Sequence, residues 1–310
     1  MNVETMKVIA VVVTYNRFSL LQRTVDCLKR QSRRVDSIVV VDNGCTDGTA
    51  AWLDSQTGLH VVHQNNEGGS GGFFTGIKCA FDMDADWIWC MDDDVFPRAD
   101  CLEHLLQHVD DDTRCDIMAP RRLLGGQVYT NDFCRYNLSN PFASMYQEKL
   151  KRRGAVCEPV DIAGTAFEGM FVKRAVVAGI GLPEKGLFIF CDDTDYCLRA
   201  VQSGFTIRYI PDALMDKEQF FLDASWTERN RKKKWKRFYQ VRNSTFLSHK
   251  YGNNVAVRYL RGFICVAGYI LTALATAPFS RAYSFADIPL FWRAYRDGLN
   301  HRLGIIKSNA

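Results

Sequence analysis

The sequence predicts an α/β protein with a mixed, mainly parallel sheet flanked by helices, followed by a helical, basic and amphipathic C-terminal region. In the first ninety residues, short β-branched runs alternate with segments whose apolar residues recur at helical spacing. Polar clusters follow several of these runs directly, and the net charge changes sign along the chain. Strand–helix alternation at this spacing is typical of βαβ units, which build parallel sheets with right-handed crossovers.

Four strands and three helices are expected in the first part of the chain. The strands are expected at 7–13, 37–41, 59–62 and 87–91, and the helices at 19–31, 46–53 and 76–83. The middle of the chain is less regular. It is expected to contain strands at 117–119, 169–172 and 205–210 and a helix at 193–204, with Pro211 ending the last strand.

The composition excludes several classes of protein. The chain has 310 residues, of which 47% are hydrophobic and 24% charged, so disordered, collagen-like and coiled-coil classes are ruled out. Its 11 Cys form no C-x-x-C pair and are odd in number, which predicts reduced thiols in a cytosolic protein. The short apolar stretch at the N-terminus runs directly into polar residues, so no signal peptide is expected.

The net charge of +4 conceals an asymmetry between the two parts of the chain. From residue 218 onward there are 16 Lys or Arg and 5 Asp or Glu, a balance of +11, which leaves −7 on the first 217 residues. Such a division indicates two parts with different partners. We expect a catalytic domain at 1–222 and a helical region at 223–310 that associates with a membrane or an acceptor.

Three consecutive aspartates, Asp92, Asp93 and Asp94, follow the strand expected at 87–91. Adjacent carboxylates repel one another unless a cation or solvent relieves them. Mg2+ or Mn2+ prefers such oxygens and shares its coordination shell with substrate phosphates. In an extended segment Asp92 and Asp94 point to one side and Asp93 to the other. The pattern therefore predicts that Asp92 and Asp94 face a metal–diphosphate, and a solvated acidic turn is the alternative.

Two further polar clusters lie at the same expected edge of the sheet. The glycine-rich stretch 66–73 is expected to be a loop before a helix, where backbone amides approach an anionic ligand closely. It lacks the Gly-Lys-Ser/Thr of a Walker loop, and a flexible loop is the alternative. Asp42 ends the second strand, where its carboxylate is suited to accept the imide N–H of uracil or thymine, or to form a turn.

A third acidic cluster, Asp192, Asp193 and Asp195, lies at the start of the helix expected at 193–204. Carboxylates are favoured there by the helix dipole, so capping alone is one interpretation. The functional interpretation requires one of them to act as a general base on an acceptor hydroxyl.

The ordered motifs TYNR, VVVDN, NNEGGSGGF, MDDDV and CDDTDYCLRA resemble the inverting glycosyltransferase family 2, which has the GT-A fold. The resemblance covers about residues 7–217. The glycine-rich motif combined with three aspartates is most similar to the galactofuranosyltransferases, and some rhamnosyltransferases share it. The resemblance implies a nucleotide-sugar donor and a Mn2+ or Mg2+ cofactor.

The resemblance also implies roles for individual residues. Asp193 would be the general base. Asp92 and Asp94 would hold the metal, and Asp42 would read the base of the donor. The other residues implied for the donor site are Thr14, Asn16, Arg17, Asn66, Gly68, Gly69, Gly71, Gly72 and Asp93. Those implied for the acceptor site are Asp192, Asp195, Phe167 and Glu168.

One departure from the family concerns the third metal ligand, which is often a His after the strand that follows the base helix. The corresponding stretch, 210–218, contains no His. Asp216 is the candidate substitute, and otherwise the metal would rely on the aspartates and the phosphates. Among the histidines, His60 and His63 are expected only as strand-end residues.

The C-terminal region combines a basic run with an apolar one. Residues 229–237 include seven Lys or Arg in nine, which fits a solvated helix face, a nucleic-acid arm or a membrane-facing segment. No nucleic-acid-binding fold accompanies this run, so no nucleic-acid partner is expected. Residues 262–279 carry no charge, and membrane insertion at the interface, packing in a core and a membrane span remain open.

Together these features favour a metal-dependent inverting glycosyltransferase, peripheral on the cytoplasmic face of the membrane. We expect it to transfer galactofuranose from UDP-galactofuranose to a lipid-linked cell-surface glycan, with the anionic membrane surface as a further partner. A rhamnosyltransferase using dTDP-rhamnose is the nearest alternative, because uracil and thymine share the imide edge. A catalytically inactive nucleotide-sugar-binding protein is the alternative of a different class.

Overall fold

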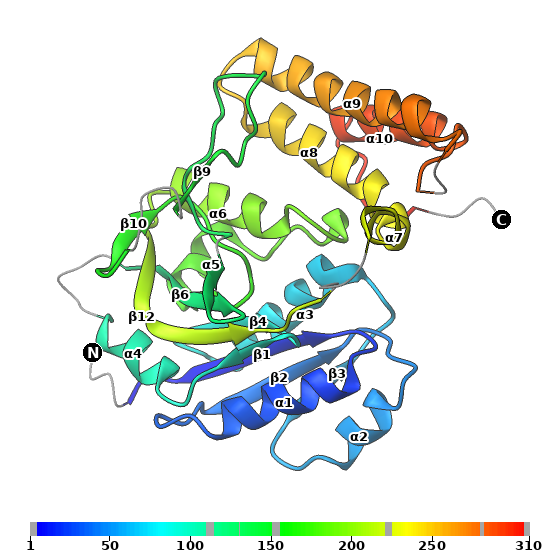
Figure 1. The fold of residues 1–310 in the computed structure, drawn as a ribbon. Coiled ribbons are helices and arrows are strands. Elements are labelled where there is room, and N and C mark those ends of the chain that lie inside the picture. The colour runs from blue at the N-terminus through cyan, green and yellow to red at the C-terminus, as the bar shows by residue number, and fades with distance from the viewer. Residues whose placement is uncertain are drawn as a thin grey trace. The chain divides into compact units, whose positions relative to one another are not determined.

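The computed structural model describes residues 5–109, 115–129, 131–150, 156–220, 225–279 and 282–306. The chain forms two compact units (Figure 1). The first unit comprises Met1–Arg135, Glu148–Lys185 and Asp192–Glu218, and the second comprises Tyr136–Gln147, Gly186–Cys191 and Gln219–Ala310. The division expected at residue 222 lies close to Gln219, but the second unit also takes in two short segments from the middle of the chain.

Four parallel strands form one half of the central sheet, in the spatial order β3-β2-β1-β4. Their bounds are β1 Val8–Thr14, β2 Ser37–Asp42, β3 His60–His63 and β4 Trp87–Asp92. All four lie within one residue of the expected ranges. The two central strands, β1 and β4, consist of almost entirely buried side chains, as in a parallel sheet covered on both faces.

The other half of the sheet is mixed in direction. It continues from β4 through β11, β6, β12 and β10, with β5 paired to β12 and β7 to β6. The bounds are β5 Val95–Pro97, β6 Ile117–Leu124, β7 Gln127–Tyr129, β10 Val160–Ile162, β11 Phe171–Lys173 and β12 Ile207–Lys217. A separate small sheet pairs β8 Phe133–Arg135 with β9 Glu148–Lys149. The mixed, mainly parallel sheet predicted from the sequence is confirmed.

Helices cover both faces of this sheet (Figure 1). Their bounds are α1 Phe18–Lys29, α2 Thr49–Ser55, α3 Gly68–Asp82, α4 Cys101–Gln107, α5 Arg174–Ile180 and α6 Asp192–Gln202. Leu21 of α1 shares a core with Val8 and Val12 of β1. Helix α3 packs against the alternate residues, Val11 and Val13, and therefore covers the opposite face.

The glycine-rich stretch is not the predicted loop, because it forms the first turns of α3. The helix begins at Gly68, eight residues before the expected start. Gly72 and Gly76 allow it to lie directly on β1. A Cβ added at either position would be 2.3 Å from a methyl group of Val13 or Val11. Close packing against the sheet therefore outweighs the low helix propensity of glycine.

Strand β12 also differs from its expected range. It continues through Pro211 to Lys217, with a shift in its pairing register against β6 between Ile210 and Leu214. An irregularity of this kind accommodates a residue that has no N–H to donate. The extension ends with Asp216 and Lys217, and Lys217 is part of the candidate active site.

The second unit contains the predicted C-terminal helices. Their bounds are α7 Trp226–Lys232, α8 Arg237–Tyr251, α9 Arg261–Thr276 and α10 Asp287–Leu299, with short helical turns at Lys185–Leu187 and Lys234–Lys236 and a π-helical turn at Ala256–Leu260. Ser225 begins α7 with a capping box, in which its hydroxyl accepts from the Glu228 amide. Helices α8, α9 and α10 share a core that includes Phe238, Val266 and Phe291.

A strained segment of the second unit precedes α6 in the chain. Phe188, Phe190 and Cys191 have φ values of 65°, 67° and 70°, a region that side-chain-bearing residues rarely adopt. The buried Asn243 of α8 donates through Nδ2 to the carbonyls of Leu187, Ile189 and Phe190, at 2.8–3.0 Å. The two N–H groups of this one amide are therefore shared among three carbonyls of the segment that leads directly to Asp192.

Replacing Asn243 with Ala is expected to lower the free energy of unfolding by about 1–3 kcal/mol, because buried carbonyls lose their donor. The measurement is urea unfolding of the full chain. Asn253→Ala removes an exposed amide that donates to Ser139 in the same unit, and it is expected to change stability by less than about 0.5 kcal/mol. An equal loss in both variants would show that the three carbonyls do not depend on Asn243.

Candidate active site

The three consecutive aspartates lie at the carboxyl end of β4, in the first unit. Asp93 accepts from the Thr14 hydroxyl at 2.8 Å and pairs with the Arg17 guanidinium at 2.9 Å. Asp94 pairs with the same Arg17 nitrogen at 3.0 Å. The sequence predicted that Asp93 points to the opposite side from Asp92 and Asp94. This prediction is wrong, because the chain turns after Asp92 and the carboxylates of Asp93 and Asp94 both reach the Arg17 guanidinium.

Lys217, at the end of β12, was not predicted as a site residue. Its ammonium group lies 2.9 Å from Asp94 and 2.9 Å from Glu168. Burial opposes its charge, but the nearby carboxylates outweigh burial and raise the pKa of Lys217, so that it stays protonated. The other oxygen of Glu168 pairs with the fully buried Arg122 at 3.2 Å. Glu168 and Asp94 are thus joined through one lysine.

Asp92 differs from its neighbours because its carboxylate makes no hydrogen bond or ion pair to any residue in the described ranges. Burial raises its pKa well above the ordinary value, and the charges of Asp94 and Glu168 raise it further. Such a carboxylate, held beside other anions, is suited to accept a cation. Carboxylate oxygens are also the ligands that Mg2+ and Mn2+ prefer.

The carboxylates around Asp92 supply only part of the coordination shell of a divalent cation. Among the described residues, no group of three or more His, Cys, Asp or Glu side chains is arranged to hold a metal ion. Asp92 and Asp94 supply two carboxylates, and Mg2+ sites commonly combine one or two carboxylates with the phosphates of a substrate. The pair is consistent with a cation whose shell is completed by a diphosphate.

The structure does not bring Asp216 to this pair. Asp216 makes a two-point ion pair with Arg98, at 3.1 and 3.2 Å, on the outside of β12. Side chains alternate along a strand, so Lys217, the next residue, points toward Asp94 instead. The side chain from this stretch that lies beside Asp94 is therefore the ammonium group of Lys217, and not the carboxylate of Asp216.

Replacing Asp216 with Asn is expected to leave any binding of a divalent cation at Asp92 and Asp94 unchanged, because Asp216 points toward Arg98. The measurement is Mn2+ binding to the wild type and the variant as a function of Mn2+ concentration. A shift of the half-maximal Mn2+ concentration by tenfold or more would show that Asp216 is a ligand after all.

Asp193 is the second residue of α6 and is only partly buried. Its Oδ1 accepts from the backbone N–H and the hydroxyl of Thr194, at 2.6 and 3.1 Å. Its Oδ2 has no partner among the residues that the structure describes. Burial and the charge of Asp192 raise the pKa of Asp193 to about 7, and the charge of Glu168 contributes in the same direction. A carboxylate with this pKa and one free oxygen is suited to take a proton near neutral pH.

The two neighbouring aspartates are more enclosed. Asp192 is buried, and desolvation raises its pKa to about 6. Asp195 is fully buried and pairs with Arg199 one turn later in α6, at 2.9 Å. Arg199 also donates to the carbonyls of Ile180 and Leu182. Asp195 therefore anchors the helix, and its burial gives no support to a direct acceptor contact.

Asp42 is held by two donors at the end of β2. It accepts from the Cys45 amide at 2.8 Å, and His63 at the end of β3 lies 2.8 Å from its other oxygen. Burial opposes the negative charge, but these hydrogen bonds outweigh it and lower the pKa of Asp42. The same contact raises the pKa of His63, which also contacts Asp54. His63 is thus a partner of the proposed base-reading carboxylate and more than a strand-end residue.

The remaining residues implied for the donor site surround the start of α3 and the end of β1. Asn16, with φ 52°, accepts through Oδ1 from the Thr46 amide at 2.7 Å. Asn66 accepts from the Gly68 amide at 2.9 Å. Nothing lies within 4 Å of a Cβ added at Gly69, whereas at Gly71 it would meet the Glu67 side chain at 2.4 Å and Gly72 packs on β1. Only Gly69 of these three glycines faces open space.

The loop before α3 is fixed by a residue that the sequence analysis did not single out for this role. The buried Asn43 donates to the Gly68 carbonyl at 2.9 Å and accepts from the Glu67 amide at 3.1 Å. It couples the end of β2 to the start of α3.

Phe167 lies in the interior of the first unit with 3% of its surface exposed. Its ring stacks on Phe73 at 4.6 Å between centroids and contacts Tyr196 at 5.6 Å. This burial gives no support to the expectation that Phe167 stacks on an acceptor sugar. Its neighbour Glu168 does reach the charged cluster, where it influences both Asp92 and Asp193.

The geometry thus places two acidic groups, Asp92–Asp94 and Asp192–Asp193, around Glu168 at one end of a mixed sheet. The sequence matches the description glycosyl transferase family 2 over residues 9–169, more than half of the chain. The chain belongs to glycosyl transferase family 2. It is a glycosyltransferase, and its sheet has the GT-A architecture implied by the resemblance.

Relatives of this glycosyltransferase include galactofuranosyltransferases and a rhamnosyltransferase. Galactofuranosyltransferase GlfT1 of Mycobacterium tuberculosis is 29% identical over 67% of this chain and 69% of its own length. GlfT1 of Mycolicibacterium smegmatis is 26% identical over 77% of this chain and 82% of its own. The dTDP-rhamnosyl transferase RfbF of Shigella flexneri is 26% identical over 66% and 67%.

A solved structure shares the fold of this glycosyltransferase. The crystal structure of GalNAc-T7 with UDP, GalNAc and Mn2+ superposes with a TM-score of 0.54 and 14% sequence identity. The match covers 86% of this chain and 57% of that one. At this identity the comparison shows the fold.

Proposed function

We propose that this glycosyltransferase is a metal-dependent inverting enzyme that transfers galactofuranose from UDP-galactofuranose to a hydroxyl of a lipid-linked cell-surface glycan. The observation that supports it most is Asp193, a carboxylate with a pKa of about 7 and one oxygen without a partner among the described residues. One base without a second nucleophile suits a single displacement. The galactofuranosyltransferase relatives support the choice of sugar.

The displacement is one step in which Asp193 takes the proton of the acceptor hydroxyl. The hydroxyl oxygen forms a bond to the anomeric carbon while the bond from that carbon to the diphosphate oxygen breaks, and the diphosphate leaves with the electron pair. The anomeric configuration is inverted, and the transition state has oxocarbenium character as in glycoside hydrolysis. Thr194 holds one oxygen of Asp193, which leaves the other to receive the proton.

The donor diphosphate would lie beside Asp92 and Asp94, which would hold the divalent cation. A bound cation would stabilise the negative charge that develops on the leaving diphosphate. Lys217 supplies a second, permanent positive charge next to Asp94. Arg17 fixes Asp93 and Asp94 in place, so the aspartates are preorganised before the donor binds.

The base of the donor would be read by Asp42, which His63 and the Cys45 amide keep ionised. An ionised carboxylate accepts the imide N–H that uracil and thymine have in common. A rhamnosyltransferase using dTDP-rhamnose therefore remains the second candidate, favoured by the similarity to the Shigella flexneri protein. A catalytically inactive nucleotide-sugar-binding protein is the third.

The second unit supports a peripheral position on the inner membrane surface. Within the described ranges, one helical stretch, Ala256–Thr276, is long and apolar enough to cross a membrane by length and composition alone. Several of its large side chains are exposed, among them Phe263, Leu271 and Leu274. The basic run 229–237 belongs to the same unit and suits anionic headgroups. We infer that this unit lies on the membrane that carries the acceptor.

The donor is tested by incubating the protein and Mn2+ with UDP-galactofuranose or dTDP-rhamnose and a panel of synthetic glycan acceptors, and measuring nucleotide release and product mass. UDP-galactofuranose is expected to be consumed at least tenfold faster. Preferential use of dTDP-rhamnose would support the second candidate. Binding of both donors without turnover on any acceptor would support the third.

A further inference from the structure

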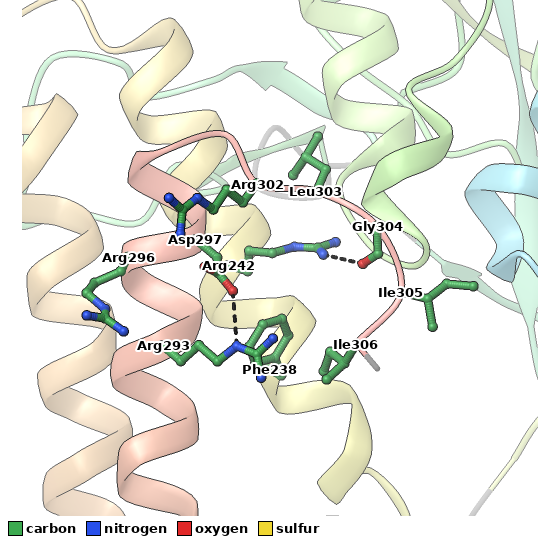
Figure 2. A pocket seen from close by; sticks show the side chains of 10 residues that line it. All are labelled: Phe238, Arg242, Arg293, Arg296, Asp297, Arg302, Leu303, Gly304, Ile305 and Ile306. Atoms are coloured by element: carbon green, nitrogen blue, oxygen red, sulfur yellow. Dashed lines mark hydrogen bonds and ion pairs between the residues drawn. The ribbon is translucent and has the colours of Figure 1, made fainter. Parts of the chain in front are cut away.

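A polar pocket of about 290 Å3 lies in the second unit, away from any residue assigned above to the donor, the acceptor or the metal. Figure 2 shows that its walls come from α8, from the end of α10 and from the chain that follows α10. Four arginines line it: Arg242, Arg293, Arg296 and Arg302. Asp297 is the one carboxylate among the lining residues.

The charges in this pocket are not balanced. Arg293 lies 3.5 Å from Asp297, so the negative charge of the single carboxylate is already balanced by one arginine (Figure 2). The guanidinium groups of Arg296 and Arg302 make no hydrogen bond or ion pair to any side chain or carbonyl in the part of the chain that the structure describes. Both residues are exposed, so their positive charge is available to a ligand.

Arg242 forms the inner wall and is almost fully buried, with 2% of its surface exposed. It donates to the carbonyls of Gly304, Gly186 and Leu187 and to the Asn243 side chain. These neutral acceptors hold it rigidly, but none of them neutralises it. Burial lowers its pKa to about 10, and the charge of Asp297 offsets this only in part. An anion in the pocket would relieve this desolvation.

We propose that this pocket binds a phosphate or diphosphate group. Guanidinium groups match phosphate oxygens with two parallel hydrogen bonds, and those of Arg296 and Arg302 are uncommitted among the described residues. Arg242 adds a third positive charge that Asp297 does not neutralise, although most of its N–H groups are already donated. The volume of this pocket is close to the lower limit for small-molecule sites, which is about 300 Å3. It therefore suits a diphosphate headgroup and is too small for a complete nucleotide sugar.

The surroundings of the pocket favour a phosphate carried by a lipid. Trp292 lies one helical turn before Arg296 on α10, is 43% exposed, and contacts Phe263 of α9 at 6.4 Å between ring centroids. Exposed aromatic rings beside basic side chains are typical of the boundary between headgroups and acyl chains. Identifying this lipid with the carrier of the acceptor glycan rests on the proposed function, whereas the phosphate site does not.

The first arm of the test uses inorganic pyrophosphate. Calorimetry is performed on the full chain in EDTA, so that any cation-dependent binding at the aspartates is suppressed. The wild type is expected to bind pyrophosphate, and the double variant Arg296→Gln/Arg302→Gln at least about tenfold more weakly. The control Arg229→Gln/Arg231→Gln removes the same charge from α7 and is expected to bind like the wild type. No binding by the wild type, or equal loss in both double variants, would overturn the proposal.

The second arm distinguishes the source of the phosphate. Phosphatidylcholine vesicles containing 20% phosphatidic acid are compared, by sedimentation, with vesicles containing 20% phosphatidylglycerol. A lipid ligand predicts that Arg296→Gln/Arg302→Gln selectively loses the preference for phosphatidic acid. The control is expected to sediment less with both kinds of vesicle, because Arg229 and Arg231 belong to the basic run. An equal preference for phosphatidic acid over phosphatidylglycerol in all three proteins, together with the pyrophosphate result above, would assign the site to a free phosphate or diphosphate.

The same samples distinguish failure of the phosphate site from failure of the proposed function. Mn2+-dependent UDP binding is measured for each protein and is expected to be equal, because both double variants lie outside the aspartate cluster. Pyrophosphate binding that depends on Arg296 and Arg302 in a protein that transfers no sugar would sustain the phosphate site and contradict the proposed function.

Discussion

Replacing Asp193 with Asn is expected to reduce sugar transfer by 10²–10⁴-fold, the range typical of a lost general base. The amide keeps the acceptor for the Thr194 hydrogen bonds but cannot take the proton of the acceptor hydroxyl. UDP binding is expected to be unchanged, because Asp193 is not one of the carboxylates proposed to hold the cation or to read the base. The measurements are kcat/KM for transfer and the dissociation constant of UDP.

A matched control for this variant is Asp161→Asn. Asp161 lies in β10 of the same unit, is exposed, and pairs with Arg208 at 2.9 Å. The control is expected to retain full activity. If Asp193→Asn keeps wild-type kcat/KM, or if it also loses UDP binding, Asp193 is not the general base.

The raised pKa of Asp193 has two consequences for pH dependence. The wild-type kcat/KM is expected to fall as pH drops below about 7, because the base becomes protonated. Since the folded pKa lies above the ordinary value of 3.8, the contribution of Asp193 to stability is lost as pH rises from about 4 through 7. Asp193→Asn cannot ionise, so its stability should exceed that of the wild type increasingly over this range. Thermal unfolding at pH 5 and pH 8 checks the sign.

Asp92→Asn is expected to remove the effect of Mn2+ on donor binding. Of the three consecutive aspartates, Asp92 is the one whose carboxylate has no partner among the described residues. Replacing it therefore leaves no Lys or Arg unpaired, whereas replacing Asp94 would remove a partner of Arg17 and Lys217. In the wild type, Mn2+ should strengthen UDP binding. In Asp92→Asn this gain should vanish, and kcat/KM should fall at least a hundredfold, on the order of 3 kcal/mol of lost transition-state stabilisation.

The stability of Asp92→Asn keeps this prediction distinct from misfolding. Burial and the charges of Asp94 and Glu168 disfavour the ionised carboxylate, so the neutral amide is expected to unfold at a higher temperature than the wild type at pH 8. A wild type whose UDP affinity is unaffected by Mn2+ or Mg2+ would contradict the metal-dependent mechanism and favour a binding protein without catalysis.

The first half of the sheet was predictable because its strands are short β-branched runs that end in polar residues. The start of α3 was not, since four glycines in its first five residues have low helix propensity and the helix is stabilised by tertiary packing on the sheet, including contact with Val11 and Val13. The end of β12 was missed for a related reason. Pro211 normally ends a strand, and only the bulge that follows allows pairing to continue.

Site residues on the strand ends were predictable from local motifs, whereas their partners were not. Lys217 is 123 residues from Asp94 in the chain, and nothing in its local sequence marks it as an ion-pair partner. Side chains alternate along β12, so a shift of one residue in its pairing would turn Asp216, and not Lys217, toward the aspartates. His63 was recognisable only as a strand end. The pairing of β3 with β2, which places His63 opposite Asp42, was the signal that would have linked them.

The most direct test of the central claim is the structure of the product formed from UDP-galactofuranose and a lipid-linked acceptor in the presence of Mn2+. Nuclear magnetic resonance of that product gives the configuration of the new linkage. Inverting transfer by a single displacement predicts a galactofuranosyl product whose anomeric configuration is opposite to that of the donor. A product with the donor's configuration, or nucleotide-sugar binding without any product, would contradict the account.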